Sequence, residues 1–89
     1  MARKIKSTKS FKKDLKRVAK RNKDIAKLDT VIELLANDVD LPIKNEDHRL
    51  TGQAKKRECH IEPNWLLIYE KREKCLVLHR TGSHPDLFE

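Results

Sequence analysis

The chain has 89 residues, of which 39% are charged and 37% are hydrophobic, and its formal net charge at pH 7 is +7. A chain of this length provides one domain, residues 1–89, with a modest core. The longest apolar run, residues 65–69, is far too short to span a bilayer, and no apolar stretch follows the basic N-terminus. These features exclude a membrane-spanning protein and a secretory signal, so we expect a cytoplasmic protein.

The positive charge is concentrated at one end of the chain. Residues 1–27 contain twelve Lys and Arg but only two Asp, a net charge of +10, whereas residues 28–89 carry −3. Such a block can attract a phosphate backbone by releasing counterions, or an acidic protein partner, or it can be a solvated helix face. Composition alone does not separate these alternatives.

The N-terminal half predicts a short edge strand followed by two helices. In residues 2–7, Lys and Arg flank a single Ile, a pattern typical of a charge-protected edge. Two amphipathic helices follow, over residues 10–21 with Ser10 as the N-cap and over residues 23–38. Their apolar stripes are Phe11, Leu15 and Val18 in the first helix and Ile25, Leu28, Ile32 and Leu35 in the second.

The C-terminal half predicts an antiparallel sheet. Residues 40–55 lack periodicity and read as an ordered loop. Three strands follow, over residues 56–62, 65–71 and 74–80, separated by two tight turns. The fold class is therefore α+β, with an N-terminal αα-hairpin packed on a small antiparallel sheet. Strand alternation predicts that Cys59 and Ile61 face the helices, whereas Glu58 and His60 face solvent together.

The two cysteines predict neither a disulfide nor a metal site. Cys59 and Cys75 are sixteen positions apart without a CxxC spacing, so they read as small buried side chains in a reducing compartment. A metal site could in principle draw on these cysteines and on His60, His79 or His84. No pair has the usual ligand spacing, so we expect no metal and no other cofactor.

Three histidines form a candidate acid/base set. His48, His60 and His84 each lie in a short polar segment, and imidazole can both take and give a proton near neutral pH. RNA can be cut without a metal when a base deprotonates the 2′-hydroxyl, cations stabilise the phosphate charge and an acid protonates the departing 5′-oxygen. Glu58, two residues from His60 on an outward strand face, can tune that histidine.

The C-terminal segment, residues 80–88, carries further candidates. Gly82 can supply a turn that lifts His84 off the end of the strand, and Phe88 can stack on a splayed base or pack against the core. Trp65 opens an apolar strand, so core or rim packing is its default role. His79 reads as a plain exposed strand residue.

Three motifs in order carry a family resemblance: residues 47–52 (DHRLTG), 57–69 (RECHIEPNWLLIY) and 80–88 (RTGSHPDLF). With the basic helical hairpin before them, these motifs resemble the YafQ-type branch of the RelE/ParE toxin superfamily over nearly the whole chain. The resemblance implies a ribosome-dependent mRNA interferase, which is the toxin of a type II toxin–antitoxin pair and cleaves the message in the ribosomal A site. It also implies the same α+β architecture.

Site roles and partners follow from the same resemblance. His48, His60 and His84 match the catalytic histidines, with His84 the direct participant in proton transfer, and Glu58 matches an acidic position. The residues expected to contact RNA are Arg57, Asn64, Trp65, Arg80 and Phe88. The implied partners are a RelB/DinJ-like antitoxin, the ribosome and mRNA, with the basic helices contacting ribosomal RNA or the antitoxin. Asn64 departs from the pattern, which has Asp before the Trp, and an amide cannot take a proton as a carboxylate can.

Two other functions remain open from the sequence. One is a non-enzymatic inhibitor of DNA gyrase, as in the ParE branch, although a protein that acts by binding alone needs no acid/base set. The other is a small RNA-binding module or toxin remnant without catalysis, which the charge block and Asn64 would suit.

Overall fold

The computed structural model describes residues 2–53 and 55–88, and in them three α-helices and a 3₁₀ helix accompany a five-stranded sheet. The helices are α1 (Lys9–Lys20), α2 (Ile25–Ala36), the 3₁₀ helix η1 (Ile43–Asn45) and α3 (His84–Phe88). The strands are β1 (Lys4–Ser7), β2 (His48–Arg49), β3 (Arg57–Glu62), β4 (Trp65–Lys71) and β5 (Cys75–Gly82). The predicted α+β class is confirmed.

The strands lie side by side in the order β1-β5-β4-β3-β2. β3, β4 and β5 pair antiparallel, which confirms the meander predicted for residues 56–80. β1 confirms the predicted edge strand, but it pairs with β5 in parallel, with Ile5 opposite Leu76. The sheet is therefore mixed, because strand periodicity alone does not encode the direction of a partner strand.

The segment predicted to be a loop, residues 40–55, contains η1 and β2. β2 is two residues long and pairs His48 with Glu58 and Arg49 with Arg57. No periodic pattern can show in so short a strand, which is why the sequence reads as a loop there. The pairing places His48 directly beside β3.

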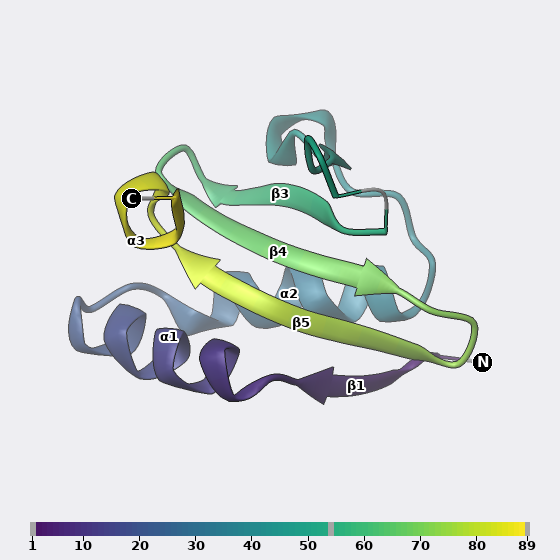
Figure 1. Cartoon of the computed structure of the whole chain (residues 1–89), viewed down its shortest axis with the longest axis horizontal. Coiled ribbons are helices and arrows are strands. Elements are labelled where there is room, and N and C mark those ends of the chain that lie inside the picture. The colour runs from purple at the N-terminus through teal and green to yellow at the C-terminus, as the bar shows by residue number, and fades with distance from the viewer. Residues whose placement is uncertain (1, 54, 89) are drawn as a thin grey trace.

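The helices α1 and α2 confirm the predicted hairpin and cover one face of the sheet, while α3 lies at one end of the sheet near the β3–β4 turn (Figure 1). The apolar stripes of both long helices pack on the sheet. The core residues are Phe11, Val18, Leu28, Val31, Ile32, Leu35, Ala36, Cys59, Ile61, Trp65, Leu67, Tyr69, Leu76 and Leu78. Within the described ranges, no helix has the length and apolar character needed to cross a membrane.

The predicted N-cap of the first helix is wrong by two residues. Thr8, not Ser10, caps α1, because its Oγ1 accepts the N–H of Phe11 at 3.0 Å. Ser10 lies inside the first helical turn. The Thr8 hydroxyl also donates to the carbonyl of His79 at 2.9 Å, which fixes the start of α1 against β5.

Strand alternation in β3 is confirmed for Cys59 and Ile61, which face the helices. Glu58 and His60 lie on the opposite face, but Glu58 is 6% exposed, so the expectation that it faces solvent is wrong. A register shift between His60 and Glu62 turns Glu62 back toward the helices, where it binds the Nζ atoms of two lysines of that layer. The shift therefore leaves Glu62 on the helical face of the sheet and Glu58 on the opposite face, beside His60.

The prediction of two buried cysteine side chains is confirmed for Cys59 and wrong for Cys75. Both Cys59 and Cys75 are free thiols, Cys59 buried and Cys75 half-buried. Burial raises the pKa of the Cys59 thiol to about 12, which keeps it protonated and unreactive at neutral pH.

The prediction that His79 is a plain exposed residue is wrong. Its side chain is 18% exposed, and its Nε2 lies 3.1 Å from Glu70 Oε1. Arg72 Nε donates to the other oxygen of Glu70 at 2.9 Å. Hydrogen bonds from Arg72 and then His79 lower the pKa of Glu70 to about 2.

We expect Glu70→Gln to reduce the dependence of stability on pH in the acid range. Glu70 ordinarily titrates near 4.5, so its lowered pKa stabilises the folded state above about pH 4.5, and this contribution is lost as the pH falls toward 2. The difference in unfolding free energy between wild type and Glu70→Gln should therefore shrink from pH 5 to pH 2.5. Urea titrations at both pH values measure it, and a constant difference would contradict the assignment.

Candidate active site

The structure brings His60, His84 and Phe88 together at one end of the sheet. His60 belongs to β3, and His84 and Phe88 are the first and last residues of α3. The ring centroids of His60 and His84 are 6.5 Å apart, and those of His84 and Phe88 are 5.4 Å apart. Since His84 and Phe88 are both exposed, the cluster presents two imidazoles and one aromatic face to a ligand.

Each ring nitrogen of His60 faces a carboxylate. Nε2 lies 3.8 Å from Glu58 Oε1, and Nδ1 lies 3.8 Å from Glu46 Oε2. The carbonyl of Pro63 is 3.3 Å from Nδ1, and the Asn45 amide donates to the His60 carbonyl at 2.7 Å. These contacts fix both the ring and the backbone of His60, a fixed position of the kind that proton transfer requires.

His48 stands on the exposed side of the same cluster. It pairs across β2 and β3 with Glu58, and its Nδ1 lies 2.7 Å from the carbonyl of Glu46. A carbonyl only accepts, so this contact places the proton on Nδ1 and leaves the Nε2 lone pair to act as a base. The sequence placed His48 near His60 only through the resemblance, and the pairing of β2 with β3 supplies the physical reason.

Glu46 is a site residue that sequence reasoning missed. It follows η1 in the left-handed conformation, with a φ of 46°, and reaches both His48 and His60. The left-handed conformation favours Gly or Asn, so nothing in the residue type signals this geometry. Only its position, two residues before a candidate histidine, could have indicated a role.

A short helix, α3, carries His84 and Phe88, although the sequence predicted only a turn there. Gly82 supplies that turn, with a φ of 152°. A Cβ on Gly82 would meet Asp86 Oδ2 at 3.0 Å, so glycine also allows the Asp86 side chain to fold back. Asp86 accepts from the Ser83 N–H at 3.0 Å, and the Asp86 N–H donates to Ser83 Oγ at 3.3 Å, a reciprocal cap of α3.

Arg21 of the α1–α2 turn ties α3 to the rest of the fold. Its Nη1 and Nη2 donate to Asp86 Oδ2 and Oδ1 at 2.6 and 3.1 Å. This pair, followed by the Ser83 N–H, holds the pKa of the Asp86 carboxyl well below its usual range. The position of His84 therefore depends on an ion pair outside the histidine cluster.

Arg80 is held in place by a buried carboxylate of α1. Arg80 Nε and Nη2 donate to Asp14 Oδ2 and Oδ1 at 2.6 and 3.1 Å, and the Thr81 N–H donates to Asp14 Oδ2 at 3.2 Å. Asp14 is 2% exposed, whereas the Arg80 side chain is 35% exposed. The hydrogen bonds and charge of Asp14 raise the pKa of Arg80, an arginine that is already fully charged at neutral pH.

Sequence reasoning also missed Asp14. It sits on the apolar stripe of α1, three residues after Phe11 and four before Val18. A carboxylate on that stripe is the signal that could have been found, because an acid facing a core needs a cation or N–H partner. The structure shows that Arg80 and the Thr81 N–H are those partners.

The other three residues that were expected to contact RNA lie in three different environments. Trp65 is 1% exposed, and its Nε1 donates to Thr81 Oγ1 at 2.9 Å, so it packs in the core as its strand position predicts and its ring is not available for RNA. Asn64 is exposed in the β3–β4 turn. Arg57 lies at the other end of β3, where its Nε donates to Asp47 Oδ1 at 3.2 Å.

Across residues 2–53 and 55–88, no group of three or more His, Cys, Asp or Glu side chains is arranged to hold a metal ion. His60, Glu58 and Glu46 instead face one another at ion-pair distances. The arrangement suits proton transfer by side chains.

Comparisons with known proteins give one consistent result. A family model described as the bacterial toxin of a type II toxin-antitoxin system, YafQ, matches residues 3–89. The mRNA interferase toxin YafQ of Escherichia coli K12 is 44% identical over 80 residues, 88% of this chain and 87% of that protein.

Two solved structures are similar over nearly the whole fold. The E. coli DinJ-YafQ toxin-antitoxin complex has a TM-score of 0.93 at 40% identity, covering 100% of both chains. A metal-bound toxin from Helicobacter pylori has a TM-score of 0.92 at 42% identity, covering 99% and 100%.

Proposed function

The chain belongs to the YafQ family of bacterial toxins of type II toxin-antitoxin systems, and from this membership we propose that it is an mRNA interferase, an endoribonuclease that cuts messages on the ribosome. The observation that carries the proposal is the cluster of His60, His84 and Phe88, with a carboxylate facing each ring nitrogen of His60. A gyrase inhibitor that acts by binding alone would have no use for such a cluster.

The proposed chemistry needs no metal. A histidine removes the proton of the 2′-hydroxyl, the 2′-oxygen attacks the adjacent phosphorus, and the bond from phosphorus to the 5′-oxygen breaks. A second histidine gives its proton to the departing 5′-oxygen. The products are a 2′,3′-cyclic phosphate on one fragment and a 5′-hydroxyl on the other.

The geometry supports a division of roles. His84 is exposed beside His60 and transfers a proton directly, while His48 and His60 are the candidates for the second proton transfer. Arg80 stabilises the charge that develops on the phosphate, and the exposed Phe88 stacks on a neighbouring base. Asn64 cannot exchange a proton, so the carboxylate role passes to Glu58 and Glu46.

The openness of the site supports the proposed dependence on the ribosome. His48, His84 and Phe88 are all exposed, so the protein alone offers little to hold an RNA in the in-line geometry that attack requires. Correct orientation of the reacting groups can supply a large share of the rate enhancement of RNA cleavage, and a ribosomal A site would provide that orientation.

Primer extension on a defined message in a cell-free translation reaction tests this function. We expect wild-type protein to produce cuts at A-site codons, and a parallel reaction without ribosomes to produce none. Cuts that appear equally without ribosomes would contradict the ribosome dependence. An intact message together with inhibited supercoiling by purified gyrase would instead assign the chain to the gyrase-inhibitor activity.

A DinJ-like antitoxin is the proposed protein partner, because the similar E. coli toxin has been solved in complex with DinJ. The exposed face of α1 suits an acidic partner. Its exposed basic residues are Lys9, Lys12, Lys13, Lys16, Arg17 and Lys20. Native mass spectrometry of the toxin co-expressed with the product of a neighbouring gene should show a complex, and a toxin that stays free would contradict this partner.

Arg21→Ala should reduce cleavage by roughly 10- to 100-fold, because small displacements of catalytic groups lower rates on that scale. Without Arg21, the Asp86 carboxylate loses its two guanidinium hydrogen bonds, and α3 no longer holds His84 in one position. Lys20→Ala is the matched control, because it removes an exposed charge from the end of α1 without touching Asp86. Equal cleavage by the two variants would show that the ion pair does not position α3.

A further inference from the structure

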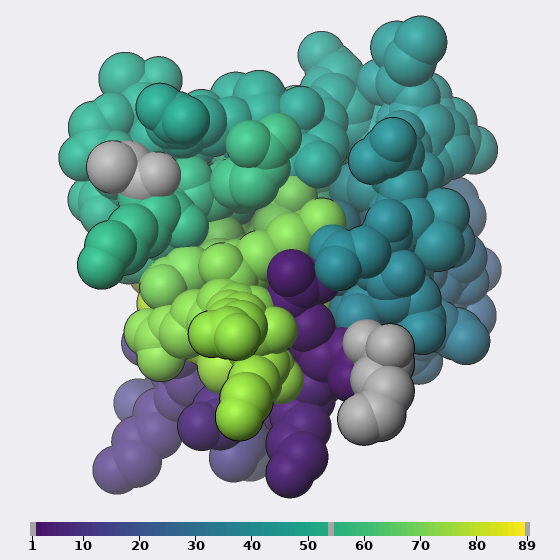
Figure 2. Space-filling model, turned by 90° about the vertical axis from the view of Figure 1, so that its right-hand side faces the viewer, coloured from purple at the N-terminus to yellow at the C-terminus, as the bar shows by residue number. Residues whose placement is uncertain are grey.

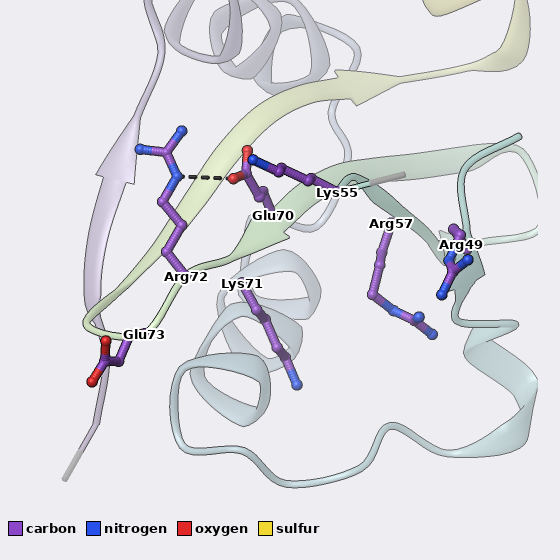
Figure 3. A pocket seen from close by; sticks show the side chains of 7 residues that line it. All are labelled: Arg49, Lys55, Arg57, Glu70, Lys71, Arg72 and Glu73. Carbon is purple, nitrogen blue, oxygen red and sulfur yellow. Dashed lines mark hydrogen bonds and ion pairs between the residues drawn. The ribbon is translucent and has the colours of Figure 1, made fainter. Parts of the chain in front are cut away.

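A basic cleft lies at the end of the sheet opposite α3. It has a volume of 570 Å³, and five of the seven side chains that line it are cationic. These five are Arg49, Lys55, Arg57, Lys71 and Arg72, and the two acids are Glu70 and Glu73 (Figure 3). Nothing in the family's proposed chemistry uses this cleft.

Two segments far apart in the sequence form its walls. The β4–β5 turn supplies one wall, and Arg49 of β2 with Lys55 and Arg57 supplies the other. In Figure 2 this end of the molecule faces the viewer, with the turn in lime and residues 50–53 and 55–56 in green above it. The cleft is open to solvent, so a long polymer can enter and leave it.

The cleft keeps a positive charge after its internal ion pairs are counted. Arg72 pairs with Glu70, Arg57 with Asp47 and Lys71 with Asp38, and Glu73 adds one further negative charge to the lining. Arg49 and Lys55 are exposed and have no carboxylate within 4 Å among the described residues. The Arg72 and Arg57 side chains remain 55% and 39% exposed, so they too can reach a ligand.

The lining indicates which chemistry the cleft recognises. It offers guanidinium and ammonium groups but no aromatic side chain on which a base could stack. Cations without base-reading groups contact backbone phosphates and are indifferent to sequence. The ligand is therefore a polyanionic backbone.

The cleft lies next to the candidate active site along β2 and β3. The cross-strand pair Arg49–Arg57 directly follows the pair His48–Glu58 along β2 and β3. The two pairs are one strand position apart, roughly 3.3 Å along the strand, and successive side chains point to opposite faces of the sheet. Because β2 is the edge strand, an RNA strand that contacts both pairs passes around this edge of the sheet. The full length of β3, six residues, corresponds to roughly 20 Å, which a few nucleotides of extended RNA can cover.

We propose that this cleft binds backbone phosphates of the same RNA strand that the histidine cluster cuts, a few nucleotides from the scissile bond. The proposal rests on the proposed RNA-cleaving function and adds a second, sequence-independent contact to it. Arg57, expected from the resemblance to contact RNA, would do so here and not at the histidines.

Fluorescence anisotropy of single-stranded RNA tests the proposal in a His84→Gln background, where the RNA stays intact. The test variant adds Arg49→Ala and Lys55→Ala, and the matched control adds Lys4→Ala and Lys6→Ala, which removes the same amount of positive charge from the exposed strand β1. RNAs of 4 and 14 nucleotides distinguish a strand that can reach both sites from one that cannot.

For the 14-nucleotide RNA we expect Arg49→Ala with Lys55→Ala to raise Kd about tenfold and to lower the slope of log K against log salt by about 1.4, since each single-strand phosphate contact contributes about 0.7. The control should leave the slope unchanged, and the 4-nucleotide RNA should show little difference. An equal rise in Kd for the test and control variants would overturn the proposal. An equal rise in Kd for the 4- and 14-nucleotide RNAs would also overturn it, because it would mean that the cleft binds a separate RNA strand. Binding is read without cleavage, so failure of the proposed nuclease activity would be seen separately.

Discussion

His84→Gln should lower the rate of message cleavage by about 10²- to 10⁴-fold, the range that a general acid or base contributes. Glutamine keeps hydrogen-bonding capacity but cannot transfer a proton at neutral pH. The variant should fold normally, because α3 is held by Gly82, Ser83 and Asp86, and the exposed imidazole of His84 takes no part in that cap. Single-turnover cleavage on programmed ribosomes measures the rate.

His79→Gln is the control for the loss of a histidine. His79 lies in β5, the strand that leads to α3, and pairs with Glu70 away from the cluster. Its replacement should leave cleavage within about twofold of wild type, as expected for a group that moves no proton in the reaction. Thermal unfolding followed by circular dichroism checks that both variants are folded. A folded His84→Gln protein that cleaves like wild type would remove His84 from the proton-transfer role.

Asp14→Ala should lower the free energy of unfolding by about 2–4 kcal/mol. The change removes a carboxylate that is 2% exposed and leaves the Thr81 N–H without its acceptor and Arg80 without its counter-ion. Most of this loss of stability comes from the buried groups that are left without their charged partner. Urea unfolding at pH 7 measures it.

Asp29→Ala provides the comparison, because Asp29 is an exposed carboxylate of α2 and its replacement should change stability by no more than about 0.5 kcal/mol. Asp14→Ala should also weaken cleavage beyond the loss of folded protein, since Arg80 would no longer be oriented toward a phosphate. Similar stabilities for Asp14→Ala and Asp29→Ala would show that the pairing of Asp14 with Arg80 is not a structural anchor.

The sequence predicted the elements whose patterns are long enough to read. Apolar spacings of three and four located α1 and α2, and alternation located the meander and the inward face of Cys59 and Ile61. It missed β2, which has two residues, and α3, which has five, because neither spans enough positions to show a period. Ser and Thr are both good N-caps, so residue type alone does not separate Ser10 from the observed cap Thr8, which the backbone conformation selects.

The candidate site was less accessible to sequence reasoning than the fold. Residue chemistry singled out His48, His60, His84 and Glu58, and the resemblance joined them into one site. Glu46 was missed because it reaches the histidines from a left-handed position after η1. The 6.5 Å between the rings of His60 and His84 depends on three separate features: the bulge in β3, the turn at Gly82 and the ion pair that holds α3. No local sequence pattern encodes that combination.

The chemistry of the cut ends tests the central claim, which is that side-chain histidines cleave the message through its own 2′-hydroxyl. Mass spectrometry of the fragments from a ribosome-containing reaction identifies those ends. The account predicts a 2′,3′-cyclic phosphate, or its hydrolysed phosphate, on the upstream fragment and a 5′-hydroxyl on the downstream fragment. A 3′-hydroxyl upstream with a 5′-phosphate downstream would mean that water attacked the phosphorus, and would contradict the account.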